Sequence, residues 1–245
     1  MKKIALNILH LIRRILIALK NHCSPQGYFL TPPPPHQLNA YEDYYKSQKI
    51  KCFQDFEKIY SEVTFVPTKK IKTYAINKSI ENNKDDTNYY LEFGVYEGAS
   101  INILSKFVKK IYGFDSFEGL KENWKGFQGI ERDAFNVKGN MPKVNSNVVL
   151  IKGWFQETLI PFLEKHNPKI NYVNIDCDTY ESTKFILKNI KKYLLKNSII
   201  IFDELYNYPG YDVNEYKALK EVFLDNEYKF IALSKDGEQG VIQIN

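Results

Sequence analysis

The stretch LEFGVYEGAS, residues 91–100, joins an apolar strand pattern to the start of a helix through a turn that contains two glycines. Gly94 and Gly98 lack a Cβ, so the backbone can bend sharply here and approach a ligand closely. The helix that follows presents free N–H groups to an anionic group. Because ligands in open α/β sheets sit at the carboxyl ends of strands, the stretch predicts a binding site at one edge of a sheet.

Short β-rich runs alternate with helical patterns around this turn, from residue 89 to the C-terminus. We expect strands at residues 89–93, 110–114, 148–151, 172–175, 198–202, 229–233 and 240–244. We expect helices at residues 100–109, 158–165, 181–195 and 215–225. This alternation predicts an α/β fold with a mostly parallel sheet and helices on both faces. Only a short polar stretch, residues 234–239, separates the last two strands, which predicts an antiparallel C-terminal hairpin at the sheet edge.

Two further regions precede this body. Residues 1–40 hold a basic amphipathic helix at 4–19 and a stiff proline run at 32–35. The helix fits either peripheral contact with an anionic membrane surface or packing on the body or on a second subunit of a homo-oligomer. Residues 41–88 predict an N-terminal helical segment, because apolar positions recur at helical spacing up to about residue 77.

Composition limits the class of protein. Five of the 34 basic residues fall within residues 1–20, and the remaining 29 balance the 29 acidic residues, so the net charge of +5 belongs to the N-terminus. A nucleic-acid enzyme more often carries a basic stripe across its main domain, so we expect no nucleic-acid partner. The three cysteines lie far apart and the four histidines are scattered, which argues for a cytoplasmic protein without disulfides or zinc. The basic helix would allow a peripheral position on the inner face of the membrane.

Asp115 ends the second expected strand, about 20 positions beyond the glycine turn, where a carboxylate can bind a ribose diol. A nucleoside-bearing cofactor is therefore expected. A nicotinamide dinucleotide would require the GxGxxG spacing, whereas Gly94 and Gly98 stand in a GxxxG spacing that suits a ligand with an amino-acid end. A structural turn without a ligand is the remaining alternative.

Four carboxylates follow two further expected strands. Asp176 and Asp178 come after strand 172–175, and Asp203 and Glu204 come after strand 198–202. Unpaired buried carboxylates are costly, so such a cluster needs a cation or shared protons. An all-oxygen set favours Mg²⁺ over zinc. The alternative is that Asp178 caps the next helix and that Asp203 and Glu204 lie in a solvated loop.

These motifs together resemble the macrocin O-methyltransferase (TylF-like) family of class I S-adenosylmethionine-dependent methyltransferases. The strings that carry the resemblance are YLEFGVYEGAS, GFDSFEGL, GWFQETL, VNIDCDTYEST and IIFDE, and the similarity covers about residues 89–245. The resemblance implies a Rossmann-like catalytic domain over that region and methylation of a sugar or glycoside hydroxyl. It further implies that Glu92, Gly94, Gly98 and Ser100 bind the methionine side of S-adenosylmethionine and that Asp115 holds its ribose. Asp176, Asp203 and Glu204 would bind Mg²⁺, and Asp178 would be the general base.

Two features depart from the family pattern. Glu204 stands where the family usually has an aspartate, and residues 1–40 match nothing in it. The acceptor, a small molecule or a glycan, is therefore open. A catechol-type O-methyltransferase would use the same metal chemistry on an aromatic diol, and a non-catalytic cofactor-binding module would keep the fold without it.

Overall fold

The computed structural model describes residues 39–125 and 133–245. The expected helix at 4–19 and the proline run lie outside these residues. The chain divides into two compact units, Met1–Tyr44 and Tyr45–Asn245, and the second unit contains the whole sheet. Within the described part of the chain, no helix is both long and apolar enough to cross a bilayer.

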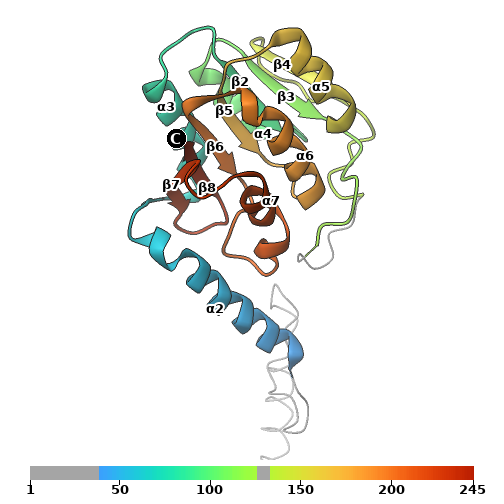
Figure 1. Ribbon diagram of the computed structural model, residues 1–245. Coiled ribbons are helices and arrows are strands. Elements are labelled where there is room, and N and C mark those ends of the chain that lie inside the picture. Colours follow the sequence, from blue (N-terminus) through green and yellow to red (C-terminus); the bar gives the residue numbers. More distant parts are fainter. Residues whose placement is uncertain (1–38, 126–132) are drawn as a thin grey trace, which may run out of the picture. The chain divides into compact units, whose positions relative to one another are not determined.

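The second unit is built on one eight-stranded sheet with the order β1-β7-β8-β6-β5-β2-β3-β4 (Figure 1). The strands are β1 (Thr64–Val66), β2 (Tyr89–Phe93), β3 (Ile111–Asp115), β4 (Val148–Lys152), β5 (Ile170–Ile175), β6 (Leu194–Phe202), β7 (Tyr228–Ser234) and β8 (Gly240–Ile244). All neighbouring strands run parallel except β8, which is antiparallel to both β6 and β7. The expected α/β sheet with its C-terminal hairpin is confirmed.

The position of the hairpin differs from the expected one. β8 lies between β6 and β7, and the outermost strand on this side is β1, which pairs in parallel with β7. β1 falls inside the stretch 41–77, for which only helices were expected. A strand of three residues is too short to show a period-two pattern, and its pairing with β7 comes from a segment more than 160 residues away. The region before residue 89 thus contributes a strand to the same sheet.

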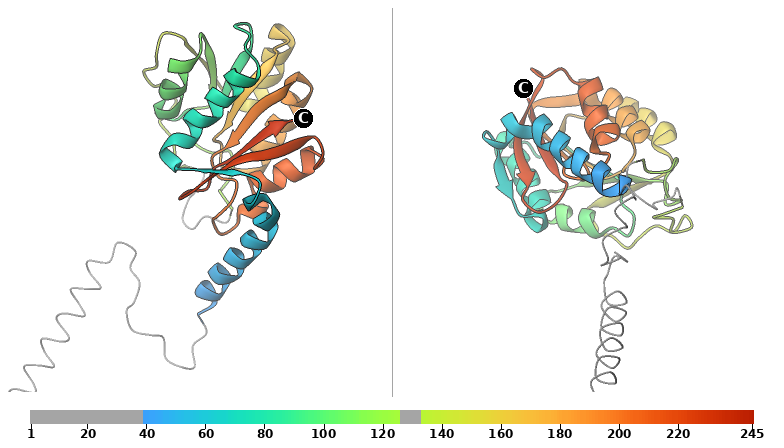
Figure 2. Two further views of the ribbon diagram at one scale, coloured as in Figure 1. Left: turned by 90° about the vertical axis from the view of Figure 1, so that its left-hand side faces the viewer. Right: turned by 90° about the horizontal axis from the view of Figure 1, so that it is seen from below.

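Helices cover both faces of the sheet (Figures 1 and 2). Alternate residues of the central strands point to opposite faces: Tyr172 packs with Ile71 and Ile76 of α3 (Thr68–Asn82), while Val173 packs with Ile186 of α6 (Tyr180–Ile190). α4 (Ala99–Leu104) lies on the α3 face, and α5 (Phe155–His166) and α7 (Glu215–Val222) lie on the α6 face. Both faces of the central strands are therefore buried, as the near-continuous apolar runs of the sequence require.

The helix boundaries differ slightly from the expected ones. α6 ends at Ile190 and passes through one 3₁₀ turn, Lys191–Tyr193, into β6. The expected helix 181–195 was therefore too long and the expected strand 198–202 too short.

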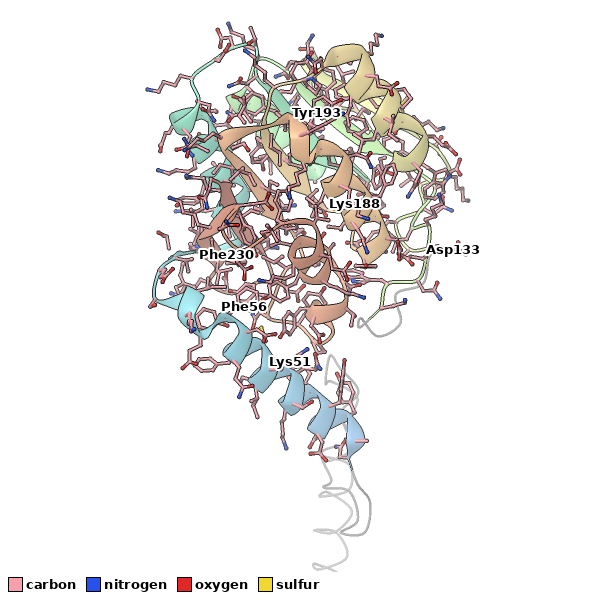
Figure 3. The ribbon with its side chains drawn as sticks, in the orientation of Figure 1. Lys51, Phe56, Asp133, Lys188, Tyr193 and Phe230 are labelled. Atoms are coloured by element: carbon pink, nitrogen blue, oxygen red, sulfur yellow. The ribbon has the colours of Figure 1, made fainter. Side chains whose placement is uncertain are left out.

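The helix α2 (Ala40–Tyr60) anchors its C-terminal half on the end of the sheet through Phe56. Phe56 is completely buried among aromatic rings from other segments, with ring centroids 5.2 Å from Tyr206 and 5.8 Å from Phe230 (Figure 3). Burying a phenylalanine contributes about 1.5–3 kcal/mol. This contact ties α2 to the loop that follows β6.

Candidate active site

A cavity of about 460 Å³ opens where the strands β2, β3, β5 and β6 end. Parallel neighbours bring their carboxyl ends to one edge, so residues distant in sequence meet there. We call it the carboxylate cavity, because its described lining includes six acidic side chains: Glu97, Asp115, Asp176, Asp178, Asp203 and Glu204. The aromatic side chains Trp124, Phe135, Trp154 and Phe155 line it as well.

The turn after β2 is fixed by backbone crowding. Gly94 has φ of +91°, and a Cβ at this position would lie 1.6 Å from the carbonyl oxygen of Asp176. No side chain fits there, so the glycine is required by the contact between the ends of β2 and β5. Gly98, with φ of +80°, precedes the first residue of α4. Both glycines thus have the turn geometry that the sequence predicted.

Asp115 holds this turn against β3. Its Oδ2 accepts hydrogen bonds from the backbone N–H groups of Val95 (2.7 Å) and Tyr96 (2.8 Å), and its Oδ1 accepts one from Phe117 (2.7 Å). Asp115, Gly94 and Ser100 line the carboxylate cavity. Three backbone donors orient the carboxylate and leave it a free lone pair for a hydroxyl donor from a ligand.

Glu92 lies beneath the turn and is completely buried. Ser100 donates a 2.7 Å hydrogen bond to its Oε1, and Asn174 donates a 3.2 Å bond to its Oε2. Burial raises the pKa of Glu92 to about 8, against the opposing effect of nearby Lys72. Glu92 therefore braces Ser100 and the start of α4 from below the cavity.

Three carboxylates of the cavity lining lie close together. Asp176, Asp178 and Glu204 each offer an oxygen that lies within 4.8 Å of the other two. Burial, together with the negative charges of neighbouring Asp176 and Asp203, raises the pKa of Asp178 to about 8. The Oε2 atom of Glu204 is buried and has no hydrogen-bond partner among the described residues. An unpartnered oxygen in an all-carboxylate group fits a hard divalent cation such as Mg²⁺.

Asp203 has a different partner from the expected cation. The Lys72 Nζ lies 2.6 Å from Asp176 Oδ2 and 3.0 Å from Asp203 Oδ1, so one ammonium bridges both carboxylates. Burial alone would lower the pKa of Lys72, but Asp176 and Asp203 hold it well above its usual value. Asp203 also accepts a 3.3 Å hydrogen bond from Gln239. Of the predicted cation ligands, Asp176 and Glu204 belong to the close group with Asp178, and Asp203 lies outside that group but shares the Lys72 ammonium with Asp176.

Two residues that contact the acidic residues of this site were not predicted from the sequence. Lys72 lies on α3, in a stretch where lysines are frequent and where only helical spacing was visible. Glu215, in the first turn of α7, is completely buried and accepts a 3.1 Å hydrogen bond from the backbone N–H of Glu204. An acidic residue in the first turn of a helix is common, so nothing in the local pattern distinguished it.

The comparisons agree with this geometry. A family model described as a methyltransferase domain matches residues 91–205, which hold the glycine turn and all four predicted carboxylates. The crystal structure of CalS11, a calicheamicin methyltransferase, superposes with a TM-score of 0.61 at 21% identity, covering 80% of this chain and 92% of that one. The chain has the class I methyltransferase fold.

A second structure with this methyltransferase fold is that of the O-methyltransferase NovP, with a TM-score of 0.53 at 19% identity over 72% of this chain and 78% of NovP. No curated protein matches the chain in sequence. At these identities the likeness establishes the fold, and the chemistry has to be argued from the residues of the cavity.

Proposed function

We propose that the chain is an S-adenosylmethionine-dependent O-methyltransferase that acts on a sugar or glycoside hydroxyl with the help of a divalent cation. The single observation that carries the proposal is the carboxylate cavity, in which the glycine turn after β2 and the group of Asp176, Asp178 and Glu204 line one space. A methyl donor and a hydroxyl activated by carboxylates could meet in such a space.

The cavity suits the methyl donor in charge and shape. Six carboxylates against two lysines, Lys72 and Lys121, make its lining acidic, which favours a sulfonium cation. Asp115 would accept a hydrogen bond from a ribose hydroxyl of S-adenosylmethionine, and Gly94 and Ser100 would border its amino-acid end. Trp154 and Phe155 offer ring faces for the adenine base. When bound, S-adenosylmethionine would supply an electrophilic methyl group.

Asp176 and Glu204, with one oxygen of Asp178, would hold the cation. When bound, the cation would lower the pKa of a neighbouring acceptor hydroxyl. The second oxygen of Asp178 would accept the proton of that hydroxyl, as a general base. Lys72 would keep Asp176 and Asp203 ionised and fixed, so that the group presents the same geometry before and after the acceptor binds. The aromatic walls exclude water and orient the acceptor, and such alignment supplies much of the rate in methyl transfer.

A sugar acceptor is supported by proteins of similar fold. One structure of CalS11 describes it as a TDP-rhamnose 3′-O-methyltransferase, and it superposes with a TM-score of 0.52. NovP is an O-methyltransferase of the same fold. A sugar also suits the cavity itself, because neighbouring hydroxyls can contact both the carboxylates and a cation.

The test compares the full-length chain with Asp178→Asn. S-adenosylhomocysteine binding is measured by calorimetry with and without Mg²⁺, and transfer of a labelled methyl group is measured to sugar and catechol acceptors. We expect Asp178→Asn to keep S-adenosylhomocysteine affinity within about twofold and to lower the transfer rate about 100-fold or more. Asp86→Asn, an exposed carboxyl outside the cavity, is the control.

Each outcome has a meaning. Absence of S-adenosylhomocysteine binding in any condition would overturn the proposal. Binding without methyl transfer to any hydroxyl would favour the non-catalytic module. Transfer to catechols alone would replace the sugar by an aromatic diol.

A further inference from the structure

A second cavity, of about 430 Å³, lies between α2, the start of β1 and the loop after β6. We call it the aromatic cavity; its described lining comprises Tyr45, Gln48, Lys49, Cys52, Phe53, Tyr60, Phe65, Tyr206, Asn207, Tyr208, Pro209 and Lys235. Its volume is in the range of small-molecule sites, which run from about 300 to 1,000 Å³. Nothing in the proposed chemistry uses it.

The charge of this lining is opposite to that of the carboxylate cavity. Its described lining contains two lysines, Lys49 and Lys235, and no acidic residue. No ion pair joins either lysine to a carboxylate within residues 39–125 and 133–245. The nearby carboxylates Asp212 and Asp55 are occupied by Lys51 and by the Tyr211 hydroxyl. A lining with two ammonium groups from separate segments therefore favours an anionic ligand.

Aromatic rings form the remaining walls. Phe53 and Phe65 are 55% and 45% exposed, although both are large apolar side chains. Tyr60 lies between them, with ring centroids 5.8 Å from Phe53 and 5.9 Å from Phe65. Such an exposed row of rings offers stacking surface to a planar or sugar ring. The amide side chains of Gln48 and Asn207 add hydrogen-bonding groups to the same lining.

One residue of the aromatic cavity contacts one residue of the carboxylate cavity. Tyr208 lines the former, and its ring centroid lies 6.5 Å from that of Trp124, which lines the latter. The Tyr208 hydroxyl donates a 3.2 Å hydrogen bond to the carbonyl oxygen of Glu204. The short loop after β6 thus carries a proposed cation ligand at one end and the aromatic cavity at the other.

We infer that the aromatic cavity binds a nucleoside diphosphate group, with the base or its ribose on the Phe53–Tyr60–Phe65 row and the phosphates on Lys49 and Lys235. The contact between Tyr208 and Trp124, one from each lining, makes a nucleotide-linked sugar the natural source of this group. That link rests on the proposed function, whereas the nucleotide site itself does not.

The experiment titrates UDP and TDP into the full-length chain by calorimetry, at low and at physiological salt, with and without saturating S-adenosylhomocysteine. Titrations with uridine and with inorganic diphosphate measure the contributions of the nucleoside and of the phosphates to binding separately. The variants are Lys49→Ala with Lys235→Ala, and Phe53→Ala. The matched controls are Lys46→Ala with Lys229→Ala, which are lysines outside the lining, and Ile50→Ala, an exposed apolar residue on the same helix.

We expect the double variant Lys49→Ala with Lys235→Ala to weaken UDP binding about tenfold or more. It should also reduce the salt dependence of binding, because phosphate contacts are electrostatic. Phe53→Ala should weaken UDP by about fivefold or more, as loss of one stacking contact does. The control variants and S-adenosylhomocysteine should each change UDP affinity by no more than about twofold. No binding at about 1 mM, displacement of UDP by S-adenosylhomocysteine, or equal losses in the control lysines would overturn the site.

A further titration distinguishes the two sources. UDP-glucose bound as tightly as UDP supports the nucleotide-linked acceptor. Rejection of UDP-glucose by about tenfold limits the cavity to a free nucleoside diphosphate and overturns the link to the acceptor. Since nucleotide binding is measured without methyl transfer, it can fail while the proposed activity holds, and the reverse.

Discussion

Gly94 lies directly against the main chain of Asp176: a Cβ on residue 94 would come within 1.6 Å of the Asp176 carbonyl oxygen. The glycine turn after β2 and the carboxylates after β5 are therefore packed directly against each other. Movement of either strand end changes both, so the site depends on the pairing of β2 with β5.

Gly94→Ala should disrupt this packing. The clash with backbone and the φ of +91° should cost about 2–5 kcal/mol of stability and weaken S-adenosylhomocysteine at least about tenfold. Gly139→Ala is the matched control. Its φ is +71°, but the nearest atom is the flexible end of Lys152 at 3.0 Å, so about 1 kcal/mol is expected. Urea denaturation and calorimetry measure both quantities, and equal losses in the two variants would contradict the close contact.

Lys72→Met should leave Asp176 and Asp203 without their shared ammonium. The Lys72 and Asp176 side chains are 24% and 26% exposed, so we expect a moderate loss of about 1–3 kcal/mol. Mg²⁺ should recover part of it by restoring positive charge, and Lys72→Arg should retain most of the stability. Lys78→Met, an exposed lysine on the same helix, is the control. If Lys72→Met had the same urea midpoint of unfolding as the wild type, the Lys72 bridge would contribute nothing to stability.

Asp203→Asn and Glu204→Gln should differ in cation affinity. Asp176, Asp178 and Glu204 form the close group, whereas Asp203 lies outside it. Calorimetric titration with Mg²⁺ or Mn²⁺ should show at least about tenfold weaker binding for Glu204→Gln and no more than about threefold for Asp203→Asn. The opposite order would restore the cation set that the sequence predicted.

Glu92→Gln should remove a pH dependence of stability. The folded-state pKa of Glu92 is raised to about 8 from an ordinary value of 4.5, chiefly by burial. As pH rises from 4.5 to about 8, the unfolded chain releases this proton before the folded chain does, so the wild type loses stability across that window. This loss of wild-type stability is at most about 5 kcal/mol and does not grow further above the window.

Between pH 5 and 8, the free energy of unfolding of the variant should therefore rise relative to that of the wild type. Above pH 8 the difference between the two should stay constant. Denaturant titrations at a series of pH values measure this gap. A gap that does not change with pH would mean that Glu92 is ionised in the folded protein throughout the window.

Much of the fold could be predicted, because its signals are local. β2 and β8 have the expected bounds, since strand pattern and flanking turns coincide there. β1 was missed because three residues carry too little pattern, and its place at the sheet edge comes from β7. The short connection between β7 and β8 predicted their antiparallel pairing, but nothing in the sequence predicted that β8 lies between β6 and β7.

The sequence by itself determined that carboxylates and a glycine turn meet at one edge of a parallel sheet. The reason is that strands running parallel in one sheet have their carboxyl ends on the same side. Only the tertiary structure decided which carboxylates face one another, since that depends on side-chain directions and on α3, which brings Lys72 to Asp176 from 104 positions away. No local pattern records an ion pair between residues so far apart, because it is formed by packing α3 on the sheet and not by the chain around either residue.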